Sequence, residues 1–559
     1  MRNKYLFLFT ISPVQSFISQ ARKTRDLRAG SQILSDLIKF ALDSIKLNNP
    51  QIIFPVADSE SKPNRFITEI EFENAEEVYD FGNELSDRVK NKFIILAGEV
   101  FRKESKNQSF PKHFESQINN FLDVYWVAKP LGSDYQTAYS EIERSLASVK
   151  NIKTFKQTYE QGRKCSICGE RNAIFPSREK LESLCGICFT KRHYKKGSSK
   201  FPSTADIALQ GSFDRIISNI KDEETKARLL QIKENYPELL LTGDLEKVDW
   251  SNIEISGLDK LDIIKLLKSF MKTAKENNLK LSSYYAILIF DGDKMGEWLS
   301  GIKLPDSIRL REFHENFSVK LGEYALNASK YLDSQNRGKT IYAGGDDFLG
   351  FLNLLSLLDT IKALREMFDK EVNQHLKNKF NFKENITFSA GISIAHIKTP
   401  LRIVLQSARA MEKQAKDKEQ GNRDALAIAI IKHSGERLET YLKWTESESN
   451  NIGIISDIII QLTNDNFSST FIKAIQEEFG LKLTADEVGR GAYDNELKRL
   501  IGRSCNRKKD EKKRLISDLT NKTLKLLANC EYNQDRFYGL LNIIDFLIRE
   551  TLIKKGKEQ

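Results

Sequence analysis

Between residues 284 and 431 the pattern of hydrophobic and polar positions switches repeatedly between buried strands and amphipathic helices. A wholly apolar run at 284–290 predicts a strand, and short apolar runs at 341–343 and 348–352 flank a Gly-Gly-Asp-Asp turn. The intervening spacing predicts helices at 308–332, 354–378 and 401–418 and further strands at 386–395 and 425–431. This β-α-β-β-α-β order, with one more helix and strand, predicts a ferredoxin-like sheet whose first and third strands are central neighbours.

Outside residues 284–431 the same periodicities predict further strands and helices. Strands are predicted at 4–11, 66–72 and 121–127, and a helix at 33–47. Apolar residues at helical spacing predominate at 258–270 and again from residue 434 onward. Two mixed α/β regions therefore alternate with helical ones.

Length and composition indicate a soluble multidomain protein. A chain of 559 residues exceeds what one core organises, and its length suggests roughly three or four domains. No apolar run approaches the ~20 residues that span a bilayer, and the opening residues become polar too quickly for a signal peptide. We therefore expect a cytoplasmic protein without membrane contact. The net charge of +10, from 87 Lys and Arg against 77 Asp and Glu, is compatible with nucleic-acid or nucleotide-phosphate partners.

Four of the six cysteines form two close pairs. Cys165 and Cys168 form one C-x2-C pair, and Cys185 and Cys188 form the second. Two thiolates at this spacing can bind one ion, and two such pairs complete the tetrahedral shell of zinc. Redox pairs or disulfides are the alternative, which a cytoplasmic location disfavours. Because four protein ligands leave no open coordination position, we predict a structural Zn²⁺.

Acidic residues stand at the ends of the predicted central strands. Asp291 ends the first strand, while Asp346 and Asp347 form the tip of the hairpin between the second and third strands. Since strands one and three are neighbours, the sheet brings Asp291 beside the hairpin tip. Clustered carboxylates repel one another unless a cation lies among them, and hard oxygen ligands suit Mg²⁺ or Mn²⁺. Two such ions about 4 Å apart would stabilise an in-line nucleotidyl transfer.

Glycines accompany these carboxylates. Gly292, Gly344 and Gly345 would let the backbone and a triphosphate approach closely. The alternative interpretation of Gly-Gly-Asp-Asp is an ordinary surface turn, for which the same residues are well suited.

Several segments resemble known families. The strand-end aspartate with its Gly-Gly-Asp-Asp hairpin resembles the palm domain shared by nucleotide cyclases, GGDEF-type diguanylate cyclases and polymerases. SARAMEKQAKDKEQGNRDALAI (407–428) resembles the helix near the end of a diguanylate cyclase domain. ISPVQSFISQARKTRDLRAGSQILS (11–35), PNRF (63–66), the cysteine pairs and FPSTADIA (201–208) resemble the large subunit of type III CRISPR effector complexes, most closely of the Cmr-type, or III-B, branch.

The resemblance implies a function. Large subunits of that family sense target RNA bound by the guide complex and then polymerise ATP into cyclic oligoadenylate messengers for antiviral defence. By this resemblance Asp291, Asp346 and Asp347 bind two catalytic Mg²⁺ or Mn²⁺ ions. The implied ATP-binding residues are Gly292, Asp293, Gly344, Gly345 and Lys416. Lys416 would touch the triphosphate, the alternative being a solvated helix face. The implied partners are other type III (Cmr) subunits, guide CRISPR RNA and target RNA.

The implied fold class is α+β multidomain, with two ferredoxin-like palm (nucleotide cyclase-like) domains, a zinc-binding insertion and helical domains. We expect a degenerate palm-like domain at 1–160, a zinc-knuckle segment at 161–210, a helical domain at 211–280, the active palm at 281–433 and a C-terminal helical domain at 434–559. The first palm should bind no catalytic metal, because its first strand ends in Thr10-Ile11 where the second has Asp291-Gly292. It should form the other wall of a two-nucleotide cleft.

Other interpretations stay open. Many members of the family begin with a nuclease domain that carries a His-Asp pair, and this sequence has no His-Asp dipeptide, so we expect no such domain and no DNase activity. A diguanylate cyclase or a template-dependent polymerase would use a similar palm. Within the family, AMP from ATP could be joined to another small molecule such as S-adenosylmethionine. A catalytically silent scaffold of the guide RNA complex is the non-enzymatic alternative.

Overall fold

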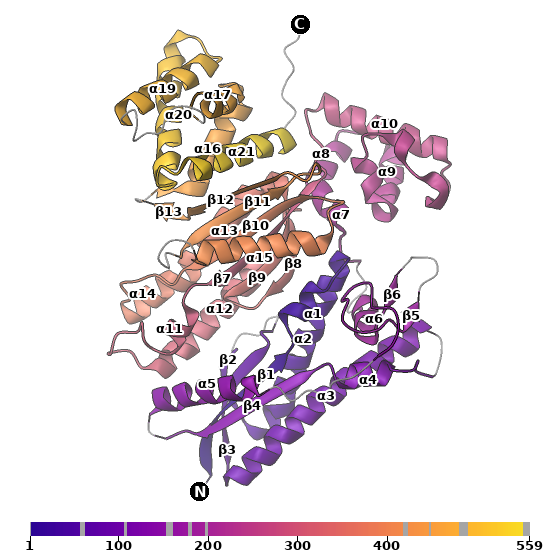
Figure 1. Cartoon of the computed structure of the whole chain (residues 1–559), viewed down its shortest axis with the longest axis vertical. Coiled ribbons are helices and arrows are strands. Elements are labelled where there is room, and N and C mark those ends of the chain that lie inside the picture. Colours follow the sequence, from indigo (N-terminus) through magenta and orange to yellow (C-terminus); the bar gives the residue numbers. More distant parts are fainter. Residues whose placement is uncertain are drawn as a thin grey trace.

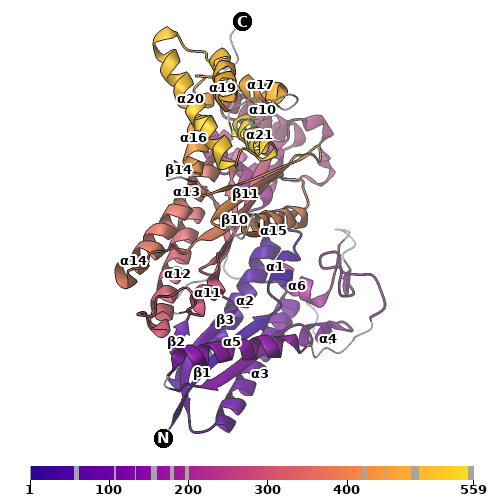
Figure 2. The ribbon, with the colours of Figure 1, turned by 60° about the vertical axis from the view of Figure 1, so that its left-hand side comes forward.

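The structure, a computed structural model, describes residues 2–55, 62–105, 109–132, 134–152, 160–176, 182–195, 200–417, 423–446, 449–479 and 490–551. Three parts follow one another along its long axis (Figures 1 and 2): an N-terminal α/β unit, a second α/β unit and a group of C-terminal helices. Each helix in these ranges is too short or too polar to span a bilayer.

The N-terminal unit is built on a four-stranded antiparallel sheet. Its strands are β1 (Asn3–Ser12), β2 (Gln51–Phe54), β3 (Arg65–Phe72) and β4 (Asp123–Pro130), in the order β2-β3-β1-β4. Residues of β1 alternate between two buried faces. Phe7 and Phe9 pack with α2 (Thr24–Ile45) and α3 (Ala75–Ser105), whereas Leu6 and Leu8 pack with α5 (Tyr135–Asn151). The sheet therefore has the 4-1-3-2 order of a ferredoxin-like fold.

The three strands predicted here are confirmed, with small shifts of their ends. β4 begins two residues later than expected, and the helix predicted at 33–47 is the second part of a longer one, α2. The strand β2 was not predicted, because its four residues carry too short a pattern.

The zinc-knuckle segment packs beside the first unit. It contains the short strands β5 (Phe175–Pro176) and β6 (Ser183–Leu184) and the helix α6 (Gly186–His193), and its cysteines belong to the same hydrophobic core as α2 and α3. The next helices, α7 (Thr204–Leu209), α8 (Ser212–Ile217), α9 (Glu223–Asn235) and α10 (Lys260–Glu276), enclose a separate small core.

The second unit is a six-stranded sheet in the order β12-β11-β10-β7-β9-β8. Its strands are β7 (Tyr284–Gly292), β8 (Gly338–Ala343), β9 (Asp347–Asn353), β10 (Phe388–His396), β11 (Ala425–Ile431) and β12 (Arg437–Lys443). The predicted adjacency of the first and third strands is confirmed, since β7 pairs with β9 along its length. The sheet continues beyond the boundary expected at residue 433, because β12 pairs with β11.

Helices cover this sheet. α12 (Leu310–Asp333) and α13 (Leu357–Phe368) lie on the face that carries Leu288 and Phe290, and α15 (Leu401–Asp417) lies on the face that carries Tyr285 and Ile287. The helix predicted at 354–378 is interrupted by a π-helical turn over Asp369–Asn373 and continues as α14 (Gln374–Phe380). Asn373 lies in this turn. Its side chain donates to the carbonyl of Ile386 and accepts from the amide of the same residue, both at 2.9 Å.

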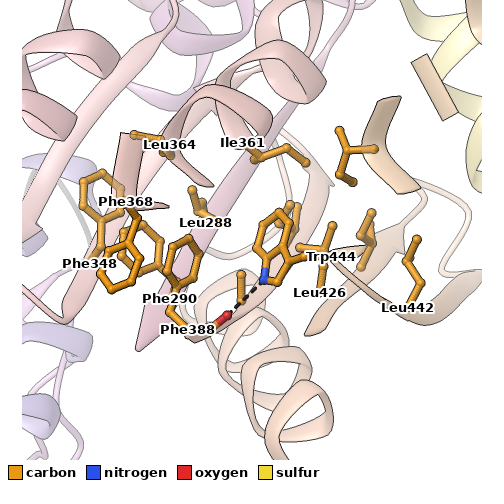
Figure 3. Packing of buried hydrophobic residues seen from close by; sticks show 14 of the residues in the cluster. Leu288, Phe290, Phe348, Ile361, Leu364, Phe368, Phe388, Leu426, Leu442 and Trp444 are labelled. Carbon is orange, nitrogen blue, oxygen red and sulfur yellow. Dashed lines mark hydrogen bonds between the residues drawn. The ribbon is translucent and has the colours of Figure 1, made fainter. Parts of the chain in front are cut away.

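A core rich in aromatic residues packs against the second sheet (Figure 3). The ring of Phe290 stacks on Phe348 at 4.8 Å and on Phe388 at 4.4 Å between centroids. Trp444 donates its indole N–H to the carbonyl of Phe388 at 2.9 Å. Because Phe290 precedes Asp291 and Phe348 follows Asp347, this packing fixes the backbone from which both carboxylates project.

The region predicted to be helical from residue 434 begins instead with β12 and the short strands β13 (Thr445–Glu446) and β14 (Ser449–Asn450), and its described residues are predominantly helical only from Asn451 onward. It comprises α16 (Asn451–Thr463), α17 (Thr470–Phe479), α19 (Arg490–Ser504), α20 (Lys509–Asn529) and α21 (Gln534–Thr551). α21 packs against the edge strand β12, where Thr440 donates its hydroxyl to the carbonyl of Arg536 at 2.8 Å. A side chain at Gly539 would lie 2.5 Å from the carbonyl oxygen of Glu439, so the helix approaches the strand closely.

A first prediction concerns Gly391 of β10, on which α15 lies directly. A Cβ atom there would lie 2.1 Å from the amide nitrogen of Glu412 and 2.2 Å from the carbonyl oxygen of Ala408. Gly391→Ala should therefore displace α15 and lower the free energy of unfolding by about 3 kcal/mol, as overpacking in a core does. Denaturant unfolding measures this. Gly491→Ala, at an exposed position of α19 where the added Cβ would meet no atom from another part of the described chain within 4 Å, is the control and should not lower stability.

Candidate active site

The three predicted carboxylates meet at one end of the second sheet. Asp291 in β7 stands directly opposite Asp347 in β9, in register across the strand pair. The amide of Gly292 donates to the carbonyl of Asp346 at 3.0 Å, which attaches the hairpin tip to the end of β7. The strand order thus brings together residues that lie more than fifty positions apart, as the sequence predicted.

Burial and mutual repulsion act on these acids. Burial, followed by the charge of Asp291, raises the pKa of Asp346 to about 6 and that of Asp347 to about 8. A cation among the carboxylates would stabilise their charged forms and lower both pKa values. Three half-buried carboxylates at the mouth of a cavity form the hard-oxygen donor set that Mg²⁺ or Mn²⁺ uses, so the residues present fit such ions.

Glycine is required at two of the predicted positions for different reasons. Gly345 has φ +116°, a conformation that L side chains rarely adopt. At Gly344 a Cβ atom would lie 1.9 Å from the hydroxyl oxygen of Tyr342, and the amide of Gly344 donates to the carbonyl of Asp347 at 2.9 Å. The tight tip that presents the two aspartates therefore depends on both glycines.

Helix α15 places a row of charged side chains over the carboxylates. Lys416 forms ion pairs with Asp291 and, at 2.9 Å, with Glu412 one turn before it. Burial alone would lower the pKa of Lys416, but the two carboxylates outweigh it and raise this pKa. Arg409 lies on the same face, and burial lowers its pKa although Asp347 and Glu412 oppose that effect. Lys416 thus lies at the site.

Glu412 and Arg409 were not singled out from the sequence. Their signal in the sequence is spacing: Glu412 lies four and Arg409 seven residues before Lys416, which puts all three on one helix face. A charged helix face is more often solvated, and only the packing of α15 across Gly391 turns this one toward the carboxylates.

Asp293 is oriented differently from the other three acids. It is buried, and its oxygens accept hydrogen bonds from the hydroxyls of Thr387 and Ser389, each at 2.8 Å, and from the amide of Asp424 at 3.0 Å. These bonds tie the end of β7 to β10 and to the start of β11. The geometry gives Asp293 an anchoring position within the fold.

The carboxylates open into a cavity of about 550 Å³ whose walls come from both α/β units. The second unit contributes Asp291, Asp346 and Asp347, together with Met295, His314 and Ser318 from its helices. The N-terminal unit contributes Asn64 and Arg65, from the PNRF segment, and Tyr139 and Glu143 of α5. Arg65 pairs with Glu143 at 2.7 Å. A cleft between the two units is therefore present in the structure.

His314 has a defined protonation state in this cavity. Its Nε2 lies 2.8 Å from the carbonyl oxygen of Leu299, and its Nδ1 lies 2.9 Å from the hydroxyl of Tyr135. Only a protonated Nε2 can pair with a carbonyl, so Nδ1 accepts from Tyr135. Burial lowers the pKa of His314 to about 4, which keeps the ring neutral at physiological pH.

The four cysteines form a separate, buried centre. Cys165, Cys168, Cys185 and Cys188 have sulfur atoms that all lie within 4.8 Å of one another, and Cys168 and Cys185 are 3.8 Å apart. A tetrahedral zinc ion with bonds of about 2.3 Å places its sulfurs about 3.8 Å apart, so the cluster fits zinc. With four closed ligands the centre is suited to stabilise the fold.

A second prediction concerns Lys416. Lys416→Ala removes the cation between Asp291 and Glu412 and leaves their charges to repel a triphosphate. A charge-assisted hydrogen bond contributes about 1.5–3 kcal/mol, so KM for ATP should rise by roughly tenfold to a hundredfold with a smaller change in kcat. Steady-state kinetics of the assembled complex measures this. Lys413→Ala, an exposed lysine of the same helix, is the matched control; an equal effect in both variants would refute a specific role.

Comparison with known proteins identifies the two units. Residues 284–427 match the family model described as "Cas10/Cmr2, second palm domain", and residues 6–129 match "CRISPR-associated protein Cmr2, N-terminal". The CRISPR system Cmr subunit Cmr2 of Pyrococcus furiosus is 23% identical over 563 aligned positions, which cover 79% of this chain and 63% of that protein. The chain thus spans less than two thirds of the length of this relative.

Solved structures agree on the fold. A type III-B Cmr-beta structure in the apo state has a TM-score of 0.63 and 15% identity, covering 94% of this chain and 82% of its own. The Cmr-beta structure bound to cognate target RNA has the same score and identity, covering 95% and 83%. The second unit thus matches the second palm domain of Cas10/Cmr2 proteins, and the chain is similar over 79% of its length to the Cmr subunit Cmr2 of Pyrococcus furiosus.

Proposed function

We propose that this protein is the nucleotidyltransferase subunit of a type III-B effector complex, which converts ATP into cyclic oligoadenylate messengers when the guide complex has bound target RNA. The observation that carries the proposal is the convergence of Asp291, Asp346 and Asp347 at a cavity that both α/β units line. The proposed partners are the other Cmr subunits, guide CRISPR RNA and target RNA, in the cytoplasm. The charge of +10 and the match to Cmr2 support such partners.

The site residues would divide the work of an in-line transfer. Asp291, Asp346 and Asp347 would hold two Mg²⁺ or Mn²⁺ ions, which when bound stabilise the charge on the attacking and leaving oxygens. Lys416 would turn from its carboxylate partners to the triphosphate, and Gly344 and Gly345 would let the phosphates approach the backbone. We assign Asp293 a positioning role, because its hydrogen bonds hold the strand ends that carry this apparatus.

The N-terminal unit would supply the second nucleotide position. Its sheet has the 4-1-3-2 order of the palm, which supports the interpretation as a degenerate palm. Where the active palm has a cluster of carboxylates, this wall offers Asn64, Arg65 and Tyr139 for nucleotide binding, and its carboxylate Glu143 is paired with Arg65, which makes it unsuited to hold a catalytic metal. Nucleotidyl transfer between two nucleotides requires that both be held close together, as binding on opposite walls of one cavity would do.

The test is conversion of labelled ATP by the assembled complex, with and without target RNA. We expect adenylate oligomers, most of them cyclic, only when target RNA is present. A product that incorporates labelled S-adenosylmethionine would replace the proposal with conjugate formation. Conversion of GTP in place of ATP would favour a diguanylate cyclase, and no conversion under any of these conditions would favour a silent scaffold.

A further inference from the structure

A second cavity, of about 1180 Å³, lies where the N-terminal unit, the zinc segment and the palm meet. Among its described lining residues eight are Lys or Arg and two, Glu238 and Asp333, are acidic. Some of these charges are paired: Arg192 with Asp26 and Glu182, Arg22 with Glu182, Lys195 with Glu104 and Lys339 with Asp333. The basic side chains of the lining still outnumber the acidic groups that they contact. This cavity is called the basic groove below.

The positive charges of the basic groove come from three separate parts of the chain. Apart from that of Arg192, they are contributed by the start of α2 and the two residues before it (Arg22, Lys23, Arg25 and Arg28), by the segment between α6 and α7 (Lys195 and Lys200) and by β8 (Lys339). Arg28 and Lys339 are half-buried, and the other five are exposed. A concave surface lined by one sign of charge focuses its potential and attracts an extended anion.

We propose that the basic groove binds the phosphodiester chain of single-stranded RNA. Clustered basic side chains are the usual complement of a nucleic-acid backbone. The groove also contains Tyr194 and Phe201, and aromatic rings beside a basic track provide surfaces on which unpaired bases stack. An acidic protein segment would use the charges but not the rings, so the combination favours RNA.

Occupancy of the groove can act on the catalytic hairpin through Arg28. This residue of α2 lines the groove, and its guanidinium donates to the carbonyl of Ile341 in β8 at 3.1 Å. The contact falls where the pairing of β8 with β9 shifts register, between Thr340 and Tyr342. Gly344, the first residue of the hairpin tip, follows three positions later. A phosphate that holds Arg28 would therefore hold the strand that leads to Asp346.

Binding is tested without ATP, so its failure is separate from failure of the proposed function. The full chain is titrated against a fluorescent single-stranded RNA of mixed sequence, about 12 nucleotides long, within the usual site sizes. The variant Arg25→Glu, Lys195→Glu, Lys200→Glu should weaken binding at least tenfold. Its slope of log K against log salt should be shallower by about two, since each lost phosphate contact removes about 0.7.

The matched control reverses the same number of charges elsewhere. Lys265→Glu, Lys268→Glu, Lys272→Glu alters three exposed lysines of α10 that do not line the groove. It should change the affinity less than twofold. Equal weakening in the two variants would show that only net charge matters and would overturn the proposal. Competition by polyglutamate as effective as by RNA of equal charge would also overturn it, in favour of an acidic protein partner.

The effect of RNA on the hairpin is measured by amide hydrogen exchange. Its importance for catalysis rests on the proposed function, but the measurement itself does not. Saturating RNA should slow exchange across residues 341–349 in the wild-type chain, because the contact of Arg28 with Ile341 becomes fixed. In Arg28→Ala the loss of one phosphate contact should weaken binding severalfold, and RNA added to saturation should leave this exchange unchanged. Unchanged exchange in the wild type with RNA bound would overturn the link between groove and hairpin.

Discussion

Replacing Asp346 and Asp347 together by Ala is expected to lower ATP conversion by the target-bound complex at least a thousandfold. Both carboxylates face the cavity, and the charge stabilisation they organise acts in the transition state. A thousandfold loss corresponds to about 4 kcal/mol, a moderate share of what metal ions contribute to phosphoryl chemistry. The measurement is the initial rate of product formation at saturating ATP and Mg²⁺.

A matched control distinguishes this loss from a general effect of charge. Asp359→Ala with Glu366→Ala removes two exposed carboxylates from α13 of the same domain and should leave the rate within twofold. Undiminished conversion by the Asp346 and Asp347 variant would show that the Gly-Gly-Asp-Asp tip is only a turn.

The isosteric pair Asp346→Asn, Asp347→Asn separates catalysis from folding. The folded-state pKa values of about 6 and 8 exceed the ordinary 3.8, so ionisation of these groups costs folding free energy as pH rises above 3.8. Without divalent ions at pH 8, the Asn variant should therefore be more stable than wild type while remaining inactive. A variant that is both inactive and less stable would point to a structural role of the two acids.

The palm sheet could be predicted because each of its strands leaves a strong local signal. Residues 284–290 are apolar throughout, since the strand is buried on both faces, and the intervening helices keep a clear period. Once the order was known, the pairing of Asp291 with Asp347 followed from topology alone. The glycines of the hairpin followed from turn chemistry.

The resemblance implied that the N-terminal unit forms the other wall of the cleft, but no local pattern showed which of its side chains reach the cavity. Arg65, Tyr139 and Glu143 reach the cavity only because two units that lie far apart in sequence pack together. Glu412 belongs to a charged helix face, a pattern that predicts exposure to solvent. Asp293 is an aspartate like Asp291, but its side chain accepts hydrogen bonds within the sheet. Contacts of this kind depend on tertiary packing, for which a single sequence carries no periodic signal.

Removal of two zinc ligands is expected to cause a large loss of folding stability. Cys165→Ser with Cys168→Ser removes two of four buried ligands, and the binding free energy of a structural zinc is folding free energy. We expect the chain to lose its zinc and at least ~4 kcal/mol of stability, a part of the ~10 kcal/mol that structural zinc supplies in small domains. Zinc content is measured by elemental analysis and stability by thermal and denaturant unfolding.

The loss should spread to the N-terminal unit, because α6 links the cysteines to α2. Arg192 pairs with Asp26 at 2.6 Å and with Glu182 at 2.7 Å, and the buried Lys191 donates to the carbonyl of Phe17 at 2.6 Å. When zinc no longer fixes α6, these buried charges lose their partners, which is costly. Faster hydrogen exchange should therefore appear in α2 as well as around the cysteines. Cys505→Ser, a half-exposed thiol outside the cluster, should change neither zinc content nor exchange. Folded protein of unchanged stability that contains no zinc would refute the structural role.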